Sequence, residues 1–102
     1  ALQGGLGMAA SANINPNGTC MFEPVHGSAP KFAGKGIANP IGAILTAQLM
    51  MEHLQYKEEA NLILKAVRMA ISENQVTRDI GGPLGTRATG DFISNTIRQL
   101  GK

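Results

Sequence analysis

The sequence predicts one domain of mixed α and β structure, with short strands followed by about three helices. Residues 1–39 are rich in glycine and proline, which favour turns and loops, whereas residues 40–102 carry apolar residues at helical spacing. The 102 residues leave room for one modest core, and 43% hydrophobic with 16% charged residues is typical of a folded chain. The composition therefore argues against disorder.

Two short strands are expected in the glycine-rich half, over residues 7–12 and 19–23. The helical half begins at Asn39 and Pro40, because asparagine is a good N-cap residue and proline a good first helical residue. The first helix is expected over residues 40–54. Its nearly continuous apolar sequence predicts that it is buried on all sides.

A second helix is expected over residues 57–74, with apolar side chains gathered on one face: Ile63, Val67, Ala70 and Ile71. The turn-rich stretch "TRDIGGPLGT" follows it. After this stretch, a third helix is expected from a cap at Thr89 to about Leu100.

Charge, cysteine content and hydropathy exclude several classes of function. Nine basic and seven acidic residues give a net charge of +2 without a run of like charge, which does not favour nucleic-acid binding. Cys20 is the only cysteine, so no disulfide forms within the chain, and a reducing, cytoplasmic location is expected. The longest apolar run, residues 41–51, is shorter than the ~20 residues that span a bilayer. Residues 1–14 do not read as a signal peptide and indicate a cut chain.

The stretch "HGSAPKFAGKGIANP", from His26 to Pro40, points to a phosphate-bearing ligand. Glycine and alanine let a backbone approach a ligand closely, and free N–H groups in such loops bind anions. Lys31 and Lys35 add positive charge, and Asn39 can both donate to and accept from a nucleobase edge. Glycine-rich turns also occur without ligands, and "GGLG" at residues 4–7 is not the Rossmann fingerprint.

Four stretches, in order, resemble the C-terminal part of the β-decarboxylating dehydrogenases: "GGLGMAASANI", "MFEPVHGSAPKFAGKGIANP", "ILTAQLMMEHL" and "TRDIGGPLGT". This family comprises isopropylmalate, isocitrate, homoisocitrate and tartrate/D-malate dehydrogenases. The resemblance implies an α/β fold of two domains, of which this chain is a C-terminal segment. Residues 1–39 form its cofactor-loop half and residues 40–102 its helical half.

Members of that family oxidise a 2-hydroxy acid, pass the hydride to NAD or NADP, and lose the β-carboxylate with the help of Mg²⁺ or Mn²⁺. The resemblance places His26 and Asn39 against the adenine, and Glu23 toward the nicotinamide end. It places Ser11 in a loop that borders the cofactor cleft. Three small residues would line the dinucleotide: Gly27, Ser28 and Ala29.

Lys31 departs from the pattern of the NAD-using members, which carry an aspartate there for the ribose diol. NADP-using isocitrate dehydrogenases carry Lys followed by Tyr, and Lys31 with Phe32 is half of that signature. Arg78 stands where those enzymes have a second contact to the 2′-phosphate, and a guanidinium suits phosphate. The resemblance thus implies a preference for NADP, or the use of both cofactors.

Catalytic residues and metal ligands are not expected within this chain. The family's substrate-binding arginines, acid–base pair and metal-binding aspartates lie upstream, and a catalytic lysine comes from the partner subunit of a homodimer. The isolated chain is therefore expected to be inactive. Isopropylmalate is the expected substrate, with isocitrate and tartrate/D-malate as alternatives. A nucleotide-binding module without catalysis and a structural interaction fragment remain as functions of other classes.

Overall fold

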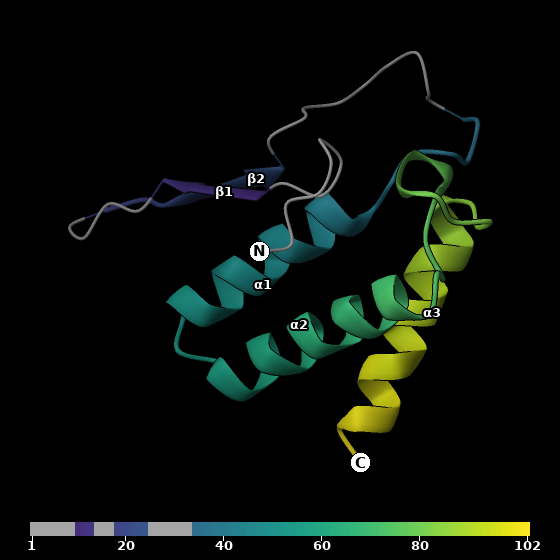
Figure 1. Cartoon of the computed structure of the whole chain (residues 1–102). Coiled ribbons are helices and arrows are strands. Elements are labelled where there is room, and N and C mark those ends of the chain that lie inside the picture. The colour runs from purple at the N-terminus through teal and green to yellow at the C-terminus, as the bar shows by residue number, and fades with distance from the viewer. Residues whose placement is uncertain (1–9, 14–17, 25–33) are drawn as a thin grey trace.

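The computed structural model describes residues 10–13, 18–24 and 34–102. Two short strands precede three α-helices, and a single 3₁₀ turn lies between the last two of them (Figure 1). In chain order the elements are β1 (Ala10–Asn13), β2 (Met21–Pro24), α1 (Ile41–His53), α2 (Lys57–Ser72), η3 (Arg78–Ile80) and α3 (Thr86–Leu100). None of these helices is long and apolar enough to cross a membrane, within the residues described.

Strands β1 and β2 form an antiparallel pair that lies against α1 (Figure 1). Ala10 is opposite Pro24, and Asn13 is opposite Met21. Both strands were expected from the sequence, and both are displaced toward the C-terminus by one to three residues. Strand ends are poorly specified by sequence because glycine and proline in the flanking turns allow several boundaries.

Helix α1 begins within one residue of where the Asn39-Pro40 pair predicts. The Ile41 N–H donates to Asn39 Oδ1 at 2.9 Å, and the Ile44 N–H donates to the Pro40 carbonyl at 3.1 Å. Pro40 has helical backbone angles of φ −83° and ψ −5°. The Asn39 side chain therefore satisfies one of the donors that a helix start leaves unpaired, while Pro40 is at the N-cap position and α1 starts at Ile41, one residue later than predicted.

The core lies between the three helices. Helix α2 runs alongside α1, and α3 packs against α2 (Figure 1). Ile41, Val67 and Ile93, one from each helix, are at most 2% exposed. On α2, Val67 and Ala70 are buried while Ile63 and Ile71 are half-buried, so the apolar face predicted for this helix points inward.

Two sequence-based predictions about the helices are wrong. Helix α1 is not buried on all sides: it packs mainly on α2 and the two strands, and Met50 on its outer face is 40% exposed. Thr89 does not cap α3, which begins three residues earlier after Gly85. The Thr89 N–H donates to the Gly85 carbonyl at 3.1 Å, so Thr89 is already one turn inside the helix, and its side chain is fully buried.

Candidate functional site

The residues assigned to cofactor binding fall partly inside the described structure. Glu23, Ser11, Asn39 and Arg78 lie within it, the first two with their backbone only. The remaining five belong to the loop before Gly34 and lie outside the described residues: His26, Gly27, Ser28, Ala29 and Lys31. Their roles remain predictions.

Ser11 and Glu23 come together in the strand pair. They are direct partners in the antiparallel register of β1 and β2. The two residues are twelve positions apart in sequence, and hairpin pairing is what brings their backbones side by side. The structure thus places Ser11, predicted to border the cofactor cleft, and Glu23, predicted to lie toward the nicotinamide end, on one strand pair next to α1.

Asn39 and the turn that carries Arg78 meet in a second cluster. Asn39 Nδ2 donates to Asp79 Oδ2 at 2.9 Å, across 40 residues of sequence. The other carboxylate oxygen, Asp79 Oδ1, accepts a hydrogen bond from the Thr77 hydroxyl. Asn39 is predicted to bind the adenine and Arg78 the 2′-phosphate. The hydrogen bond between Asn39 and Asp79 therefore joins Asn39 to the turn that carries Arg78.

Thr86, the first residue of α3, makes a second connection between residues 34–39 and the helical half. Its N–H donates to the Gly36 carbonyl at 2.9 Å, and its hydroxyl donates to the Ala38 carbonyl. Gly85 beside it lets the two segments touch, because a Cβ there would lie 2.7 Å from the Gly36 oxygen. We call residues 34–39 and 77–86, joined by these contacts, the adenosine junction.

The turn within the adenosine junction is fixed by its own backbone contacts. The Gly82 N–H donates to the Thr77 carbonyl at 2.9 Å, and the Leu84 N–H donates to the Val76 carbonyl at 2.9 Å. A side chain at Gly82 has no room, since a Cβ would lie 2.1 Å from the Val76 oxygen. The sequence "IGGPLG" therefore folds here as a tight turn in which Gly82 is buried, while Gly81 and Pro83 are exposed.

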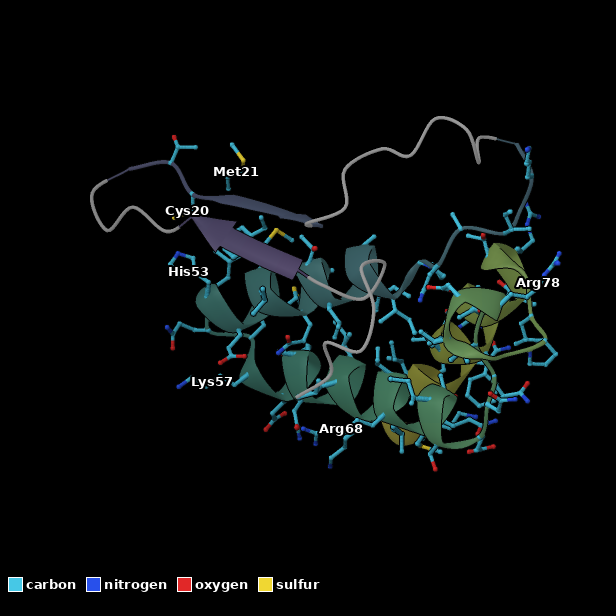
Figure 2. The ribbon with its side chains drawn as sticks, turned by 45° about the horizontal axis from the view of Figure 1, so that its top comes forward. Cys20, Met21, His53, Lys57, Arg68 and Arg78 are labelled. Atoms are coloured by element: carbon cyan, nitrogen blue, oxygen red, sulfur yellow. The ribbon has the colours of Figure 1, made fainter. Side chains whose placement is uncertain are left out.

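The chemistry of the adenosine junction suits the adenosine half of a dinucleotide. The Asn39 amide keeps one N–H and one oxygen lone pair beyond its two protein contacts, enough for a base edge. Arg78 is exposed at the outer edge of the turn (Figure 2) and offers a guanidinium to a phosphate. Gly34 and Gly36, at φ +76° and +66°, leave bare backbone in the loop. Among the described residues no group of three or more metal-ligating side chains occurs.

Asp79, Thr77 and Thr86 make the contacts that join the segments of the adenosine junction, and sequence reasoning missed all three. No role was predicted for Asp79 from the sequence. The one signal in the sequence for a role of Asp79 was its position directly after Arg78 in "VTRD", because Arg78 is predicted to bind phosphate. Pairing across 40 to 50 residues depends on the packing of α2 and α3, which sequence spacing does not reveal.

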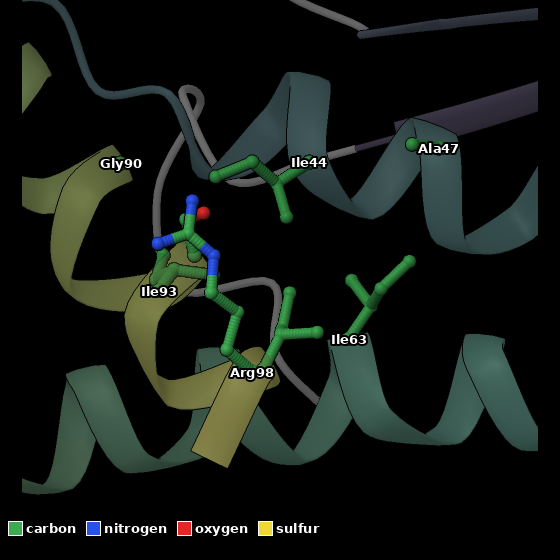
Figure 3. A pocket seen from close by; sticks show the side chains of 8 residues that line it. Ile44, Ala47, Ile63, Gly90, Ile93 and Arg98 are labelled. Carbon is green, nitrogen blue, oxygen red and sulfur yellow. The ribbon is translucent and has the colours of Figure 1, made fainter. Parts of the chain in front are cut away.

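Two other features lie apart from the predicted cofactor residues. An open pocket of about 290 Å³ between the helices is lined by Ile44, Ile63 and Ile93, with Arg98 at its margin (Figure 3). Cys20 Sγ lies 3.5 Å from His53 Nε2, where the chain enters β2 beside the end of α1 (Figure 2). The residues of both features lie outside the adenosine junction.

Comparison with known proteins identifies the family. Residues 1–95 match the family model described as isocitrate/isopropylmalate dehydrogenase. The chain is 50% identical over 99 residues to a homoisocitrate dehydrogenase of Methanocaldococcus jannaschii, covering 97% of this chain and 28% of that protein. It is 56% identical over 85 residues to a 3-isopropylmalate dehydrogenase of Methanothermobacter thermautotrophicus, covering 83% of this chain and 26% of that protein.

A solved structure extends the likeness to the fold. The isocitrate dehydrogenase of Methylococcus capsulatus superposes with a TM-score of 0.89 at 42% sequence identity, over 94% of this chain and 29% of that one. The chain thus spans less than a third of the length of the relatives it matches. With the family model matching nearly all of its residues, the chain belongs to the isocitrate/isopropylmalate dehydrogenase family.

Proposed function

We propose that this chain is part of an NAD(P)-dependent dehydrogenase that oxidises and decarboxylates a 2-hydroxy acid, and that it supplies the adenosine end of the cofactor site. Membership of the family supports the reaction class. The observation that carries the assignment of the site is the adenosine junction, where Asn39 and the turn of Arg78 are joined through Asp79. In this proposal residues 1–39 contribute the cofactor loop and residues 40–102 the helical support.

The residues of this chain bind and orient the cofactor. Asn39 holds the adenine edge with the N–H and lone pair that its protein contacts leave free. Lys31 and Arg78 neutralise a 2′-phosphate, while His26, Gly27, Ser28 and Ala29 line the dinucleotide. When bound, the cofactor would supply the hydride acceptor, and Mg²⁺ or Mn²⁺ held by residues outside this chain would supply a Lewis acid for the carbonyl.

The proposed substrate is isopropylmalate, with isocitrate and tartrate or D-malate as alternatives. The stretches "EPVHGSAP" and "GIANPI" favour isopropylmalate or tartrate/D-malate, whereas Lys31-Phe32 and "GTRATGDF" favour isocitrate. The matched relatives include enzymes named for homoisocitrate and 3-isopropylmalate. A few side chains outside this segment decide between such acids. We also propose a homodimer, because family members complete their active site with a lysine of the partner subunit.

A kinetic assay of the full-length protein tests the reaction class. We expect reduction of NADP or NAD in the presence of Mg²⁺ or Mn²⁺ with at least one of isopropylmalate, isocitrate, homoisocitrate, tartrate and D-malate. The 102-residue chain alone, assayed in parallel, should give no reduction, because the substrate and metal ligands lie elsewhere. A full-length protein that binds nucleotide but oxidises none of these acids would leave the nucleotide-binding module as the better description.

Lys31→Asp tests the cofactor assignment. The aspartate can accept hydrogen bonds from the ribose diol of NAD and repels the 2′-phosphate of NADP. A hydrogen bond to a charged group contributes about 1.5–3 kcal/mol, so kcat/KM for NAD relative to NADP should rise roughly 10- to 100-fold. Lys57→Asp, which makes the same charge change at the exposed first residue of α2, outside the adenosine junction, is the matched control. An unchanged ratio in Lys31→Asp would refute the role of Lys31.

A further inference from the structure

The Asn39 side chain is committed to the protein at both ends of its amide. Asn39 Oδ1 accepts from the Ile41 N–H at 2.9 Å, and Asn39 Nδ2 donates to Asp79 Oδ2 at 2.9 Å. A side-chain amide has two N–H donors and two oxygen lone pairs, so each end keeps one hydrogen-bonding position. What a base edge meets at Asn39 therefore depends on which way the amide is turned.

Asp79 and the start of α1 together allow one orientation of this amide. If the amide were rotated by half a turn, its NH₂ group would face the Ile41 N–H and its oxygen would face the Asp79 carboxylate. Both contacts would then be repulsive, donor against donor and acceptor against acceptor. The carboxylate contributes the stronger restraint, since a hydrogen bond to an ionised group is about twice as strong as a neutral one.

Asp79 is itself held in place. Its second oxygen accepts from the hydroxyl of Thr77, a residue that is fully buried. The Thr77 carbonyl in turn accepts from the Ile80 N–H at 3.2 Å and from the Gly82 N–H at 2.9 Å. The carboxylate is thus anchored to a turn that requires glycine at position 82, because a side chain there has no room.

We propose that Asp79 is a positioning residue for the cofactor's base, acting through Asn39. This inference rests on the proposed function, because it takes the base edge to be the group that Asn39 meets. Asp79 keeps the free N–H of Asn39 on the carboxylate side of the amide and the free lone pair on the α1 side. Arg78 and Asp79 are adjacent in sequence but act on different parts of the ligand, the first on phosphate and the second on the base.

The proposal has a signature that separates it from a role in cofactor choice. NAD and NADP carry the same adenine and differ only at the 2′ position of the ribose. A residue that orients the amide facing the base must therefore affect both cofactors alike, whereas Lys31 and Arg78 change their ratio. A residue that acts through its charge alone would instead weaken the binding of NADP, the more anionic cofactor, and removing that charge would strengthen it.

Binding of NAD and NADP to the full-length protein, measured by calorimetry, tests this. Asp79→Ala removes the contact and the charge, and we expect the Kd of both cofactors to rise about tenfold, with their ratio unchanged. Asp79→Asn removes the charge and keeps an acceptor: its oxygen can accept from Asn39 Nδ2 while its NH₂ group donates to the Thr77 hydroxyl, and the Ile41 N–H still holds the Asn39 oxygen on the α1 side. It should restore the Kd of both cofactors to within about twofold of the original value.

Thr86→Val is the matched control, because it removes the hydroxyl contact to Ala38 from the same junction without touching the Asn39 amide. Its Kd values should stay within about twofold of the original. An equal rise in Thr86→Val and Asp79→Ala would overturn the proposal in favour of general anchoring of the loop. Unchanged binding in Asp79→Ala, or tighter binding of NADP in Asp79→Asn, would overturn it as well.

The binding measurement and the kinetic assay of the full-length protein together separate this inference from the proposed function. A protein that binds both cofactors and responds to Asp79→Ala as expected, but oxidises none of the hydroxy acids, would refute the reaction while supporting the role of Asp79. An active dehydrogenase whose Asp79→Ala variant binds both cofactors normally would do the reverse. A full-length protein that binds neither cofactor would refute both.

Discussion

Asn39 shows how one side chain can serve the fold and a ligand together. Its two roles were predicted separately from the sequence, as the cap of a helix and as a contact of the adenine. The capping contact is confirmed by the hydrogen bond from the Ile41 N–H. The adenine contact stays a prediction, but the structure narrows it to the single N–H and lone pair that the two protein contacts leave free.

Thr89 is a buried polar residue with a cost. It is fully buried, and its Oγ1 has no hydrogen-bond partner within the described residues. Thr96, two turns further along α3, is also buried, but its hydroxyl donates to the Phe92 carbonyl at 2.8 Å. A buried hydroxyl without a partner lowers stability, whereas one bonded within its own helix does not.

Thr89→Val should therefore stabilise the chain. Valine has nearly the shape of threonine and a similar helix propensity, so removing the unpaired hydroxyl should raise the free energy of unfolding by about 1 kcal/mol. Urea unfolding monitored by circular dichroism measures this change. Thr96→Val is the control, and its effect should lie between no change and a loss of about 1 kcal/mol. A destabilised Thr89→Val variant would mean that the hydroxyl has a partner outside the described residues.

At the level of elements, helix starts and helix ends were predicted with different success. The starts of α1 and α2 follow from Asn39-Pro40 and from Lys57, each within one residue. The start of α3 was placed four residues late, because threonine is a good cap by type and nothing in the sequence favours Gly85 over Thr89 as the cap. Packing decides between the two, since Thr86 bonds to the loop at Gly36 and Ala38.

Both α1 and α2 end in a residue with a left-handed backbone. Gln55, after α1, has φ +73°, and the Tyr56 N–H that follows donates to the Met51 carbonyl at 2.9 Å. Asn74, after α2, has φ +57°, and the next N–H donates to the Ala70 carbonyl at 2.8 Å. These are Schellman ends, in which glycine or asparagine is favoured and glutamine is strained.

Gln55→Gly should stabilise the chain through this helix end. Relief of the left-handed strain outweighs the added freedom of glycine in the unfolded state, so the free energy of unfolding should rise by about 0.5–1 kcal/mol. The midpoint of urea unfolding should increase with an unchanged slope. Asn74→Gly is the matched control and should gain less, because asparagine tolerates this conformation. Equal gains at both positions would show that the strain at Gln55 is not the cause.

At the scale of the whole molecule, the described part leaves large apolar side chains in contact with solvent. Three of them surround the junction of α1 and α2: Met50, Leu54 and Tyr56, which are 40%, 53% and 54% exposed. Isolated apolar residues on a surface are common, but a group of this size is typical of a surface covered by another part of the protein. This fits a chain that spans less than a third of its relatives.

The sequence predicted much of this fold, and its assignment of site residues stays a prediction. Helical spacing located all three helices and the inward face of α2, because such patterns follow directly from burial. It overestimated the burial of α1, since an apolar sequence does not state how many partners surround a helix. The family motif singled out Asn39 and Arg78 as predicted cofactor contacts. The hydrogen bond that joins Asn39 to Asp79, next to Arg78, depends on the relative placement of α1, α2 and η3, which no local pattern encodes.

The double use of Asn39 has a consequence for the motions of the molecule. The backbone proton of Ile41 is protected from exchange with solvent by the same amide that Asp79 orients and that the proposed cofactor meets. Fraying of the first turn of α1 therefore releases that amide. A ligand that binds more tightly when the amide is held in place must disfavour the fraying by the same free energy. The exchange rate of one proton, on a fully buried residue, would thus report how fully the site is occupied.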